Sequence, residues 1–382
     1  MTIRLNPLPW MTEEVAMLRE AVRDFIAGEI SPHLELWRKR GYAGREIWRK
    51  MGELGMLLPE VPEAYGGAGG TFAHQFVLQE ELAWAESPPN VSVHAIAAHY
   101  ILDHGTEAQK RRWLPRLVSG ELLGAIVMTE PGGGSDLQAI RTRAVREGDG
   151  YVVNGVKTFI TGGSTANLLM LAVKTDPSAE AHGISMLVVE TDGLAGYRVG
   201  RLLDKVGMKS SDTAELYFDD VRVPADALLG GIEGRGFGQM MDQLPFERLL
   251  IAAAAQVVAE RAIELTLAHT KAREAFGGTL YDLQNTRFTL AECATVAHVT
   301  RTFLNDCVQR LLDGRLDPEV AYMTKWWCTE QQSRVLDACV QLFGGYGYML
   351  EYPIARLWAD ARVGKVYGGS NEIMKELIAR AL

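Results

Sequence analysis

The chain is poor in cysteine and has no long apolar run. Four cysteines occur among 382 residues, without the Cys-x-x-Cys spacing of zinc or redox sites, so neither a metal site nor a disulfide framework is expected. The longest apolar stretch, Leu249 to Ala255, is far shorter than the roughly 18 residues that a membrane-spanning helix needs. No membrane span is therefore predicted. The cysteines all fall in predicted helices and are interpreted as reduced core residues: Cys293, Cys307, Cys328 and Cys339.

An excess of basic residues is also missing. Lys and Arg number 39 against 48 Asp and Glu, which gives a net charge of −9. No basic cluster stands out, so no nucleic-acid partner is expected. The N-terminus lacks the apolar core of a secretory signal, and Glu13 with Glu14 argues against an organelle transit peptide. A cytoplasmic location is the default expectation, although a processed mature protein would look the same.

Helical periodicity marks the first and the last parts of the chain. Apolar residues recur at helical spacing after Thr12, the expected N-cap of the first helix. Thr106 and Gln109 have the spacing of a capping box ahead of a later helix. Long amphipathic stretches return after about residue 236. Both parts are therefore predicted to be helical.

The middle of the chain alternates apolar and polar residues with a period of two. Turn signals at 147–150 and at Asn154-Gly155 flank the expected strands. Because strands do not alternate with helices, and no glycine string both follows a strand and opens a helix, a doubly wound or Rossmann fold is disfavoured. We predict an α+β multidomain chain with an N-terminal all-α domain over 1–121, a middle β-domain over 122–232 and a C-terminal α-helical bundle over 233–382.

Two glycine-rich strings are candidates for chemistry: TEPGGGSD at 129–136 and QLFGGYGY at 341–348. Such turns can aim successive backbone N–H groups at an anion or at a cofactor edge. They also occur as plain turns or at the end of a helix. Taken alone, the strings leave both interpretations open.

Seven ordered sequence blocks resemble the acyl-CoA dehydrogenase family along nearly the whole chain. They include MTEPGGGSDL and YGGSNEIMKELIAR, and lie at 105–121, 128–137, 205–224, 235–252, 273–277, 341–348 and 367–380. The resemblance implies an N-terminal helical domain, a middle β-barrel-like domain and a C-terminal four-helix bundle, with FAD between them. The α, β, α order is the one that the periodicity predicts.

The resemblance also implies which residues contact FAD. Thr129 would hydrogen-bond the isoalloxazine ring, and Thr161 would lie near its reactive N5. The other implied contacts are Ile126, Met128, Gly134, Ser135, Phe159 and Ile160 near the ring; Arg273, Gln284, Gln341, Gly344 and Gly345 at the pyrophosphate and adenine, typically across a subunit boundary; and Ser370, Asn371 and Glu372 in the last segment.

The sequence departs from many family members at the catalytic base. Short- and medium-chain members have a Tyr-Glu-Gly motif where this chain has Tyr367, Gly368 and Gly369. Long-chain and isovaleryl-type members place the base in Leu-x-x-Glu-Arg, which here contains Glu247 and Arg248. Glu247 is thus the candidate for removing the α-proton. A surface Glu paired with a basic neighbour is the alternative interpretation.

The implied contacts to substrate are the pantetheine contact at Ser135 and those of Arg248, Gly368 and Gly369, with the Gly368 N–H donating to the thioester oxygen. Phe159 and Lys209 replace a Trp and an Arg of many members, as in the long-chain type. In the turn at 87–90, Asn90 stands where a Gly is expected near the end of the acyl pocket, which leaves pocket depth open.

The activity implied by the resemblance is FAD-dependent α,β-dehydrogenation of a medium-to-long or branched acyl-CoA to the trans-2-enoyl-CoA. Electrons would pass to an electron-transfer flavoprotein, and the assembly would be a homotetramer or dimer. An acyl-CoA oxidase is one alternative, although oxidases usually carry an additional C-terminal domain and this chain stops at Leu382. A non-catalytic FAD-binding assembly or scaffold member is the other.

Overall fold

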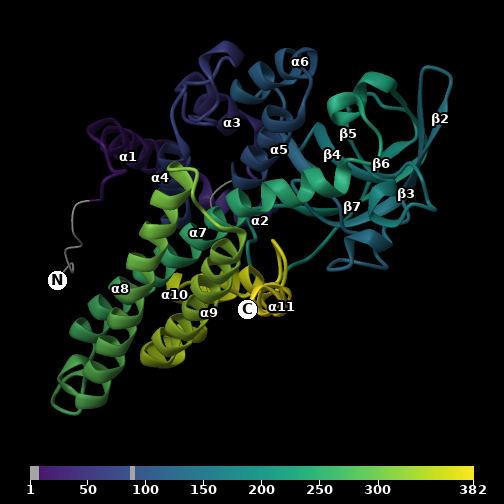
Figure 1. Ribbon diagram of the computed structural model, residues 1–382. Coiled ribbons are helices and arrows are strands. Elements are labelled where there is room, and N and C mark those ends of the chain that lie inside the picture. The colour runs from purple at the N-terminus through teal and green to yellow at the C-terminus, as the bar shows by residue number, and fades with distance from the viewer. Residues whose placement is uncertain (1–7, 87–90) are drawn as a thin grey trace.

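Three parts of the chain are distinct in the computed structural model, which describes residues 8–86 and 91–382 (Figure 1). The first helices lie at the top of the view, the sheet lies on the right, and the long C-terminal helices extend below. The α, β, α order expected from the sequence is confirmed. The predicted turn at 87–90, with Asn90, lies outside the described residues.

The first part is helical, as predicted. Thr12 caps the first helix by accepting a hydrogen bond from the Val15 N–H at 3.3 Å, and Thr106 with Gln109 forms the expected capping box. Its α-helices are α1 Glu13–Phe25, α2 Leu34–Arg40, α3 Arg45–Glu53, α4 Phe72–Trp84, α5 Val91–His104 and α6 Glu107–Val118. Helices α4 and α5 are buried on nearly every side, which places them between the other parts of the chain.

The middle part is one seven-stranded, mostly antiparallel sheet in the order β1-β4-β2-β3-β7-β6, with β5 beside β4. Its strands are β1 Gly124–Val127, β2 Arg143–Glu147, β3 Gly150–Thr161, β4 Leu168–Lys174, β5 Ile184–Glu190, β6 Tyr197–Leu202 and β7 Thr213–Pro224. Helix α5 packs against β1. The antiparallel pairing of β3 with both β2 and β7 excludes the doubly wound arrangement.

The prediction of a turn at Asn154-Gly155 is wrong. Both residues lie inside β3, at a bulge where the register against β7 shifts between Val153 and Gly155. Pairing on both edges of the strand outweighs the local turn preference. Glycine is needed there because a Cβ on Gly155 would come within 2.4 Å of the Thr142 hydroxyl oxygen.

The last part is built on three long helices. It comprises α7 Gly236–Ala272, α8 Gln284–Leu312 and α9 Pro318–Phe343, which pack on one another, and the shorter α10 Pro353–Ala361 and α11 Asn371–Ala381, which pack on α9. A hairpin of β8 Glu274–Ala275 and β9 Gly278–Thr279 follows α7 at the end of the bundle remote from the sheet (Figure 1). All four cysteines are free and buried in α8 and α9, as predicted.

A buried group of ion pairs joins the first and last parts. Arg301 of α8 pairs with Glu80 of α4 and, at 2.7 Å, with Glu260 of α7. Glu80 is also paired with Arg19 of α1 at 2.7 Å. We call Arg301, Glu80, Glu260 and Arg19 the interdomain clasp.

No helix in the described ranges is both long and apolar enough to span a membrane. Within the same residues, no cluster of three or more His, Cys, Asp or Glu side chains is arranged to hold a metal ion.

Candidate active site

Glu247 lies on α7 and points toward the turn formed by Gly368 and Gly369. A Cβ built on Gly368 would lie 3.4 Å from Glu247 Oε1. The carboxylate of Glu247 therefore ends where a side chain at position 368 would begin. The structure thus brings the two alternative base positions of the family together, from a helix and a turn that are far apart in sequence.

The environment of Glu247 is not that of a surface ion pair. Its side chain is half-buried, and no described residue donates a hydrogen bond to it. Burial raises the pKa of Glu247, while the positive charges of Arg248 and Lys325 oppose that rise. Tyr100 of α5 is buried nearby, and its pKa is raised by burial and then by the charge of Glu247.

Gly368 and Gly369 both adopt left-handed backbone angles, with φ of 63° and 86°. A Cβ on Gly368 would come within 2.3 Å of Ile251 Cδ1. Ile251 lies one helical turn after Glu247 on α7, so its side chain fills the space that a residue at 368 would need. A carboxylate at position 368 would require both a strained backbone and a displaced Ile251.

Arg248 faces the back of this turn. It is only 3% exposed, its guanidinium lies 4.7 Å from the Tyr322 ring centroid, and its Nε donates to the Gly368 carbonyl at 3.4 Å. Arg248, which the sequence predicts to bind substrate, thus contacts the turn through the Gly368 carbonyl.

The residues predicted to lie along the flavin ring come together at the ends of β1 and β3. The Thr158 N–H donates to the Thr129 carbonyl at 2.9 Å, so the segment after β1 runs beside the end of β3. Ile126 lies in β1, Met128 and Thr129 follow it, Gly134 and Ser135 lie in the next turn, and Phe159, Ile160 and Thr161 end β3. Ile160 is buried in the sheet core, so it can offer a ligand only its backbone.

This surface fits a flat aromatic cofactor. Phe159 adopts a φ of 58° at a second bulge of β3 and is 67% exposed, which presents its ring outside the sheet. A Cβ on Gly134 would meet only Thr129 Cγ2, at 3.8 Å. Packing within the chain therefore does not require this glycine, whereas the close approach of a ligand would.

A buried ion pair that sequence reasoning missed supports this surface. Lys157 of β3 is fully buried and pairs with Glu130 at 2.9 Å, and it also donates to the Met128 carbonyl at 2.8 Å. Burial lowers the pKa of Lys157 to about 8, against the opposing charge of Glu130. The pair fixes the segment after β1 onto β3. The sequence did contain a signal for this pair, because Lys157 stands at an inward-facing position of an otherwise apolar strand.

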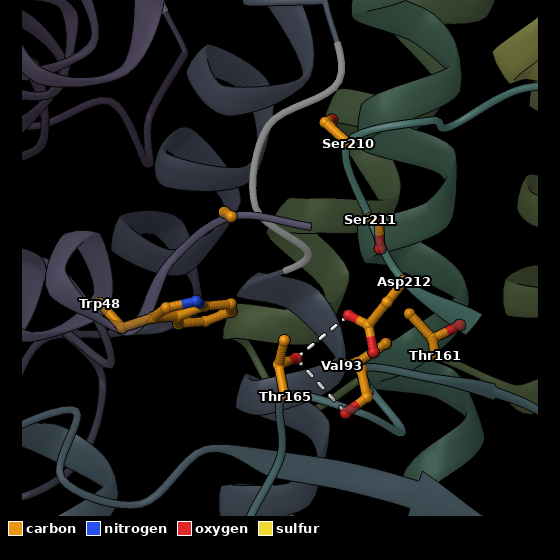
Figure 2. A pocket seen from close by; sticks show the side chains of 9 residues that line it. Trp48, Val93, Thr161, Thr165, Ser210, Ser211 and Asp212 are labelled. Carbon is orange, nitrogen blue, oxygen red and sulfur yellow. Dashed lines mark hydrogen bonds between the residues drawn. The ribbon is translucent and has the colours of Figure 1, made fainter. Parts of the chain in front are cut away.

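A small cavity lies beside Thr161, lined by Trp48, Val93, Thr165 and 210–212 (Figure 2). The Thr165 hydroxyl donates to Asp212 at 3.1 Å and to the Gly162 carbonyl at 3.4 Å, as the dashed lines in Figure 2 show. With about 30 Å³, the cavity has room for a water molecule and not for a cofactor.

The predicted pyrophosphate and adenine residues lie elsewhere. Gln341 lies in the last turn of α9, and Gly344 and Gly345 follow that helix. Arg273 follows α7 and Gln284 opens α8. All five residues are exposed, at the end of the bundle remote from the sheet (Figure 1). The Arg273 guanidinium lies 5.6 Å from the Tyr346 ring centroid. Along α7, Arg273 is about 39 Å from Glu247 at 1.5 Å per residue. The structure does not bring these residues to Thr129 and Thr161 within one chain.

The predicted last FAD segment opens α11. The Ser370 hydroxyl caps this helix by accepting from the Ile373 N–H at 3.3 Å, and Glu372 is exposed. Asn371 is 2% exposed, and its side chain is bonded to Lys325 and Thr329 of α9. Asn371 can therefore offer a ligand only its backbone. Lys209 lies outside this group, in an exposed ion pair with Asp204.

Family models of acyl-CoA dehydrogenase match three successive parts of the chain: the N-terminal domain over residues 12–121, the middle domain over 125–221 and the C-terminal domain over 234–382. The chain therefore belongs to the acyl-CoA dehydrogenase family, and it is an oxidoreductase of that family. Members are FAD-dependent, so the predicted cofactor is confirmed at this level.

Individual relatives agree over nearly the full length. The mitochondrial long-chain specific acyl-CoA dehydrogenase of Mus musculus is 46% identical over 375 residues, which cover 97% of this chain and 87% of the relative. A crystal structure of acyl-CoA dehydrogenase from Geobacillus kaustophilus has a TM-score of 0.96 and 47% identity, covering 98% and 99% of the two chains. A glutaryl-CoA dehydrogenase from Mycobacterium smegmatis, solved with FADH2, has a TM-score of 0.90 and 28% identity, covering 97% and 95%.

Proposed function

We propose that this chain dehydrogenates a medium-to-long or branched acyl-CoA to the trans-2-enoyl-CoA, with Glu247 as the catalytic base. The observation that carries the proposal is the Glu247 carboxylate lying 3.4 Å from the place of a Cβ at Gly368. The identity to a long-chain specific relative supports the long-chain end of the substrate range.

The residues around the turn formed by Gly368 and Gly369 would have different roles in the reaction. Glu247 accepts the α-proton of the thioester, and its raised pKa makes the ionised carboxylate a stronger base than an exposed Glu. The Gly368 N–H donates to the thioester oxygen, which gains negative charge as the proton leaves. Tyr100 and Ile251 line the apolar surroundings and exclude water. FAD bound along β1 and β3 would supply the hydride acceptor.

The positions of the FAD residues favour an assembly of more than one copy. Thr129 and Thr161 would contact the ring, and Phe159 would lie against it. Arg273 and Gln284, at the far end of α7, would reach the adenine half of an FAD held mainly by another copy. Exposed apolar side chains near these residues, including Phe276 at 94% exposure, suit burial between copies. We propose a homodimer or homotetramer, to be checked by the mass of the FAD-loaded protein in solution.

The test is an anaerobic titration of the FAD-loaded protein with acyl-CoA substrates of increasing length and with methyl-branched ones. The oxidised flavin band should bleach, and kcat/KM should rise beyond about eight carbons because each buried methylene contributes about 0.8 kcal/mol until the pocket is full. A maximum at butyryl-CoA would refute the long-chain assignment.

The same titration separates the rival functions. We propose that reduced protein passes its electrons to an electron-transfer flavoprotein. Rapid reoxidation by oxygen would instead identify an acyl-CoA oxidase. A flavin that no acyl-CoA bleaches would identify a non-catalytic FAD-binding member of the family.

A further inference from the structure

Lys325 of α9 is a buried cation without a carboxylate partner in contact. Its side chain is 0% exposed. Its Nζ donates to the Gly369 carbonyl at 2.7 Å and to Asn371 Oδ1 at 3.1 Å. Among the described residues it forms no ion pair, although buried lysines are otherwise almost always paired. Burial and then the charge of Arg248 lower the pKa of Lys325 to about 8.

The two carbonyls of the turn formed by Gly368 and Gly369 each accept a hydrogen bond from a buried cation. Lys325 holds that of Gly369, and Arg248 holds that of Gly368. Glycine has more backbone freedom than any other residue, so two successive glycines do not hold their left-handed angles by themselves. Rigid placement of the Gly368 N–H therefore has to come from partners outside the turn, and these two side chains provide them.

We propose that Lys325 is a positioning residue for the reaction: it fixes the turn that presents the Gly368 N–H to the thioester oxygen, and it adds positive charge where that oxygen becomes negative. The inference rests on the proposed function. Lys325 would act through the turn, because its Nζ donates to the Gly369 carbonyl.

The charged and titratable groups around Lys325 come from three helices. Glu247 and Arg248 face Lys325 from α7. Tyr322, which is on α9 like Lys325, lies beside Arg248, and Glu372 lies on α11. Only Glu247 and Glu372 are negative, and Glu372 is exposed. Removing the charge of Lys325 should therefore raise the pKa of Glu247, because one of the two cations that lower it is lost.

Three variants separate charge, hydrogen bond and packing. Lys325→Met removes the charge and the donor, and Lys325→Gln keeps a donor for the Gly369 carbonyl without the charge. Thr329→Val leaves the lysine intact and removes the neighbouring hydroxyl that bonds to Asn371 at 3.1 Å. Lys39→Met, on an exposed lysine of α2, is the control.

Single-turnover flavin reduction should fall about 10- to 100-fold in Lys325→Met, less than the 10²- to 10³-fold typical of deleting an oxyanion donor itself. Lys325→Gln should recover part of that loss. In both variants the acid limb of the pH profile should move to higher pH. Thr329→Val and Lys39→Met should keep the wild-type rate and profile.

A binding measurement provides a readout that does not depend on turnover. Calorimetry would compare an enoyl-CoA with the matching thioether, which lacks the carbonyl oxygen. The preference for the thioester should shrink severalfold in Lys325→Met. An unchanged preference with an unchanged pH profile would overturn the proposal, as would an equal loss in Thr329→Val. A wild-type flavin that no acyl-CoA reduces would instead refute the proposed function.

Discussion

Two buried groups of charge in this molecule are built in opposite ways. In the interdomain clasp, Arg301 contacts the carboxylates of Glu80 and Glu260 directly, and its pKa is raised by these partners despite burial. At the turn formed by Gly368 and Gly369, Arg248 and Lys325 are as deeply buried but contact carbonyl oxygens, and burial lowers the pKa of both. The clasp is neutralised in the resting protein, whereas the turn keeps excess positive charge.

The difference separates a structural role from a functional one. A neutralised ion-pair group joins helices and has nothing left to offer a ligand. Arg248 and Lys325 instead donate to carbonyl oxygens and keep their positive charge near Glu247. Such cations can stabilise negative charge that forms during a reaction. We therefore expect that breaking the clasp lowers the free energy of unfolding and leaves the rate of flavin reduction unchanged. Changing the residues at the turn should lower the rate and leave the stability nearly unchanged.

The largest effect is expected at Glu247. Glu247→Gln should lose roughly 10²- to 10⁴-fold in the rate of flavin reduction, the range usual for a positioned general base. Because the pKa of Glu247 is raised in the folded chain, its ionised form is a cost to folding, so the Gln variant should melt no lower than the wild type. Glu264→Gln, an exposed carboxylate on the same helix, is the control. Stopped-flow bleaching and thermal melting measure both quantities.

Breaking the clasp should give the largest loss of stability. Arg301→Met leaves the buried carboxylate of Glu80 with Arg19 alone and should lower the free energy of unfolding by about 3 to 5 kcal/mol. Arg310→Met removes an exposed pair with Asp306 on the same helix and should cost less than about 1 kcal/mol. The rate of flavin reduction per bound FAD should stay close to wild type in Arg301→Met. If it fell by as much as in Glu247→Gln, the clasp would not be purely structural.

His99 offers a smaller, pH-dependent test. It bonds Glu60 at 3.0 Å and stacks on Phe246 at 4.0 Å, and although burial opposes it, Asp103 and Glu60 raise its pKa to about 9. Its contribution to stability is complete below the unfolded pKa of about 6.5 and is lost as pH rises through about 9. The stability difference between wild type and His99→Gln should therefore shrink on the order of 1 to 2 kcal/mol across that window. A difference that stays constant with pH would show that His99 is neutral.

Relocating the base should give the smallest gain. Glu247→Gly with Gly368→Glu restores the arrangement of the other family members, but Ile251 blocks the new side chain. Adding Ile251→Ala should therefore improve flavin reduction by about tenfold over the double variant, within the range of general-base catalysis. Equal rates in the double and triple variants would show that Ile251 does not control access to position 368.

The sequence predicts the helical and strand character of the three parts because long periodic stretches report which face is buried. The bulge at Gly155 escaped prediction because the register shift that creates it occurs against β7, which lies far away in sequence. Glu247 was found only through its family motif, since an isolated Glu on a helix is usually solvated. Lys325, Lys157 and Ile251 were missed because their importance depends on which carbonyl, carboxylate or cavity they meet in three dimensions.

Proton exchange tests most directly the proposed removal of the α-proton by Glu247. A thioester whose β-carbon cannot give up a hydride would be incubated with the FAD-loaded protein in D₂O, and deuterium uptake at the α-carbon would be followed by NMR. The wild type should exchange the α-hydrogen readily, and Glu247→Gln should slow the exchange by at least about 10²-fold, with Glu264→Gln unchanged. Exchange at the wild-type rate in Glu247→Gln would show that another group takes the proton.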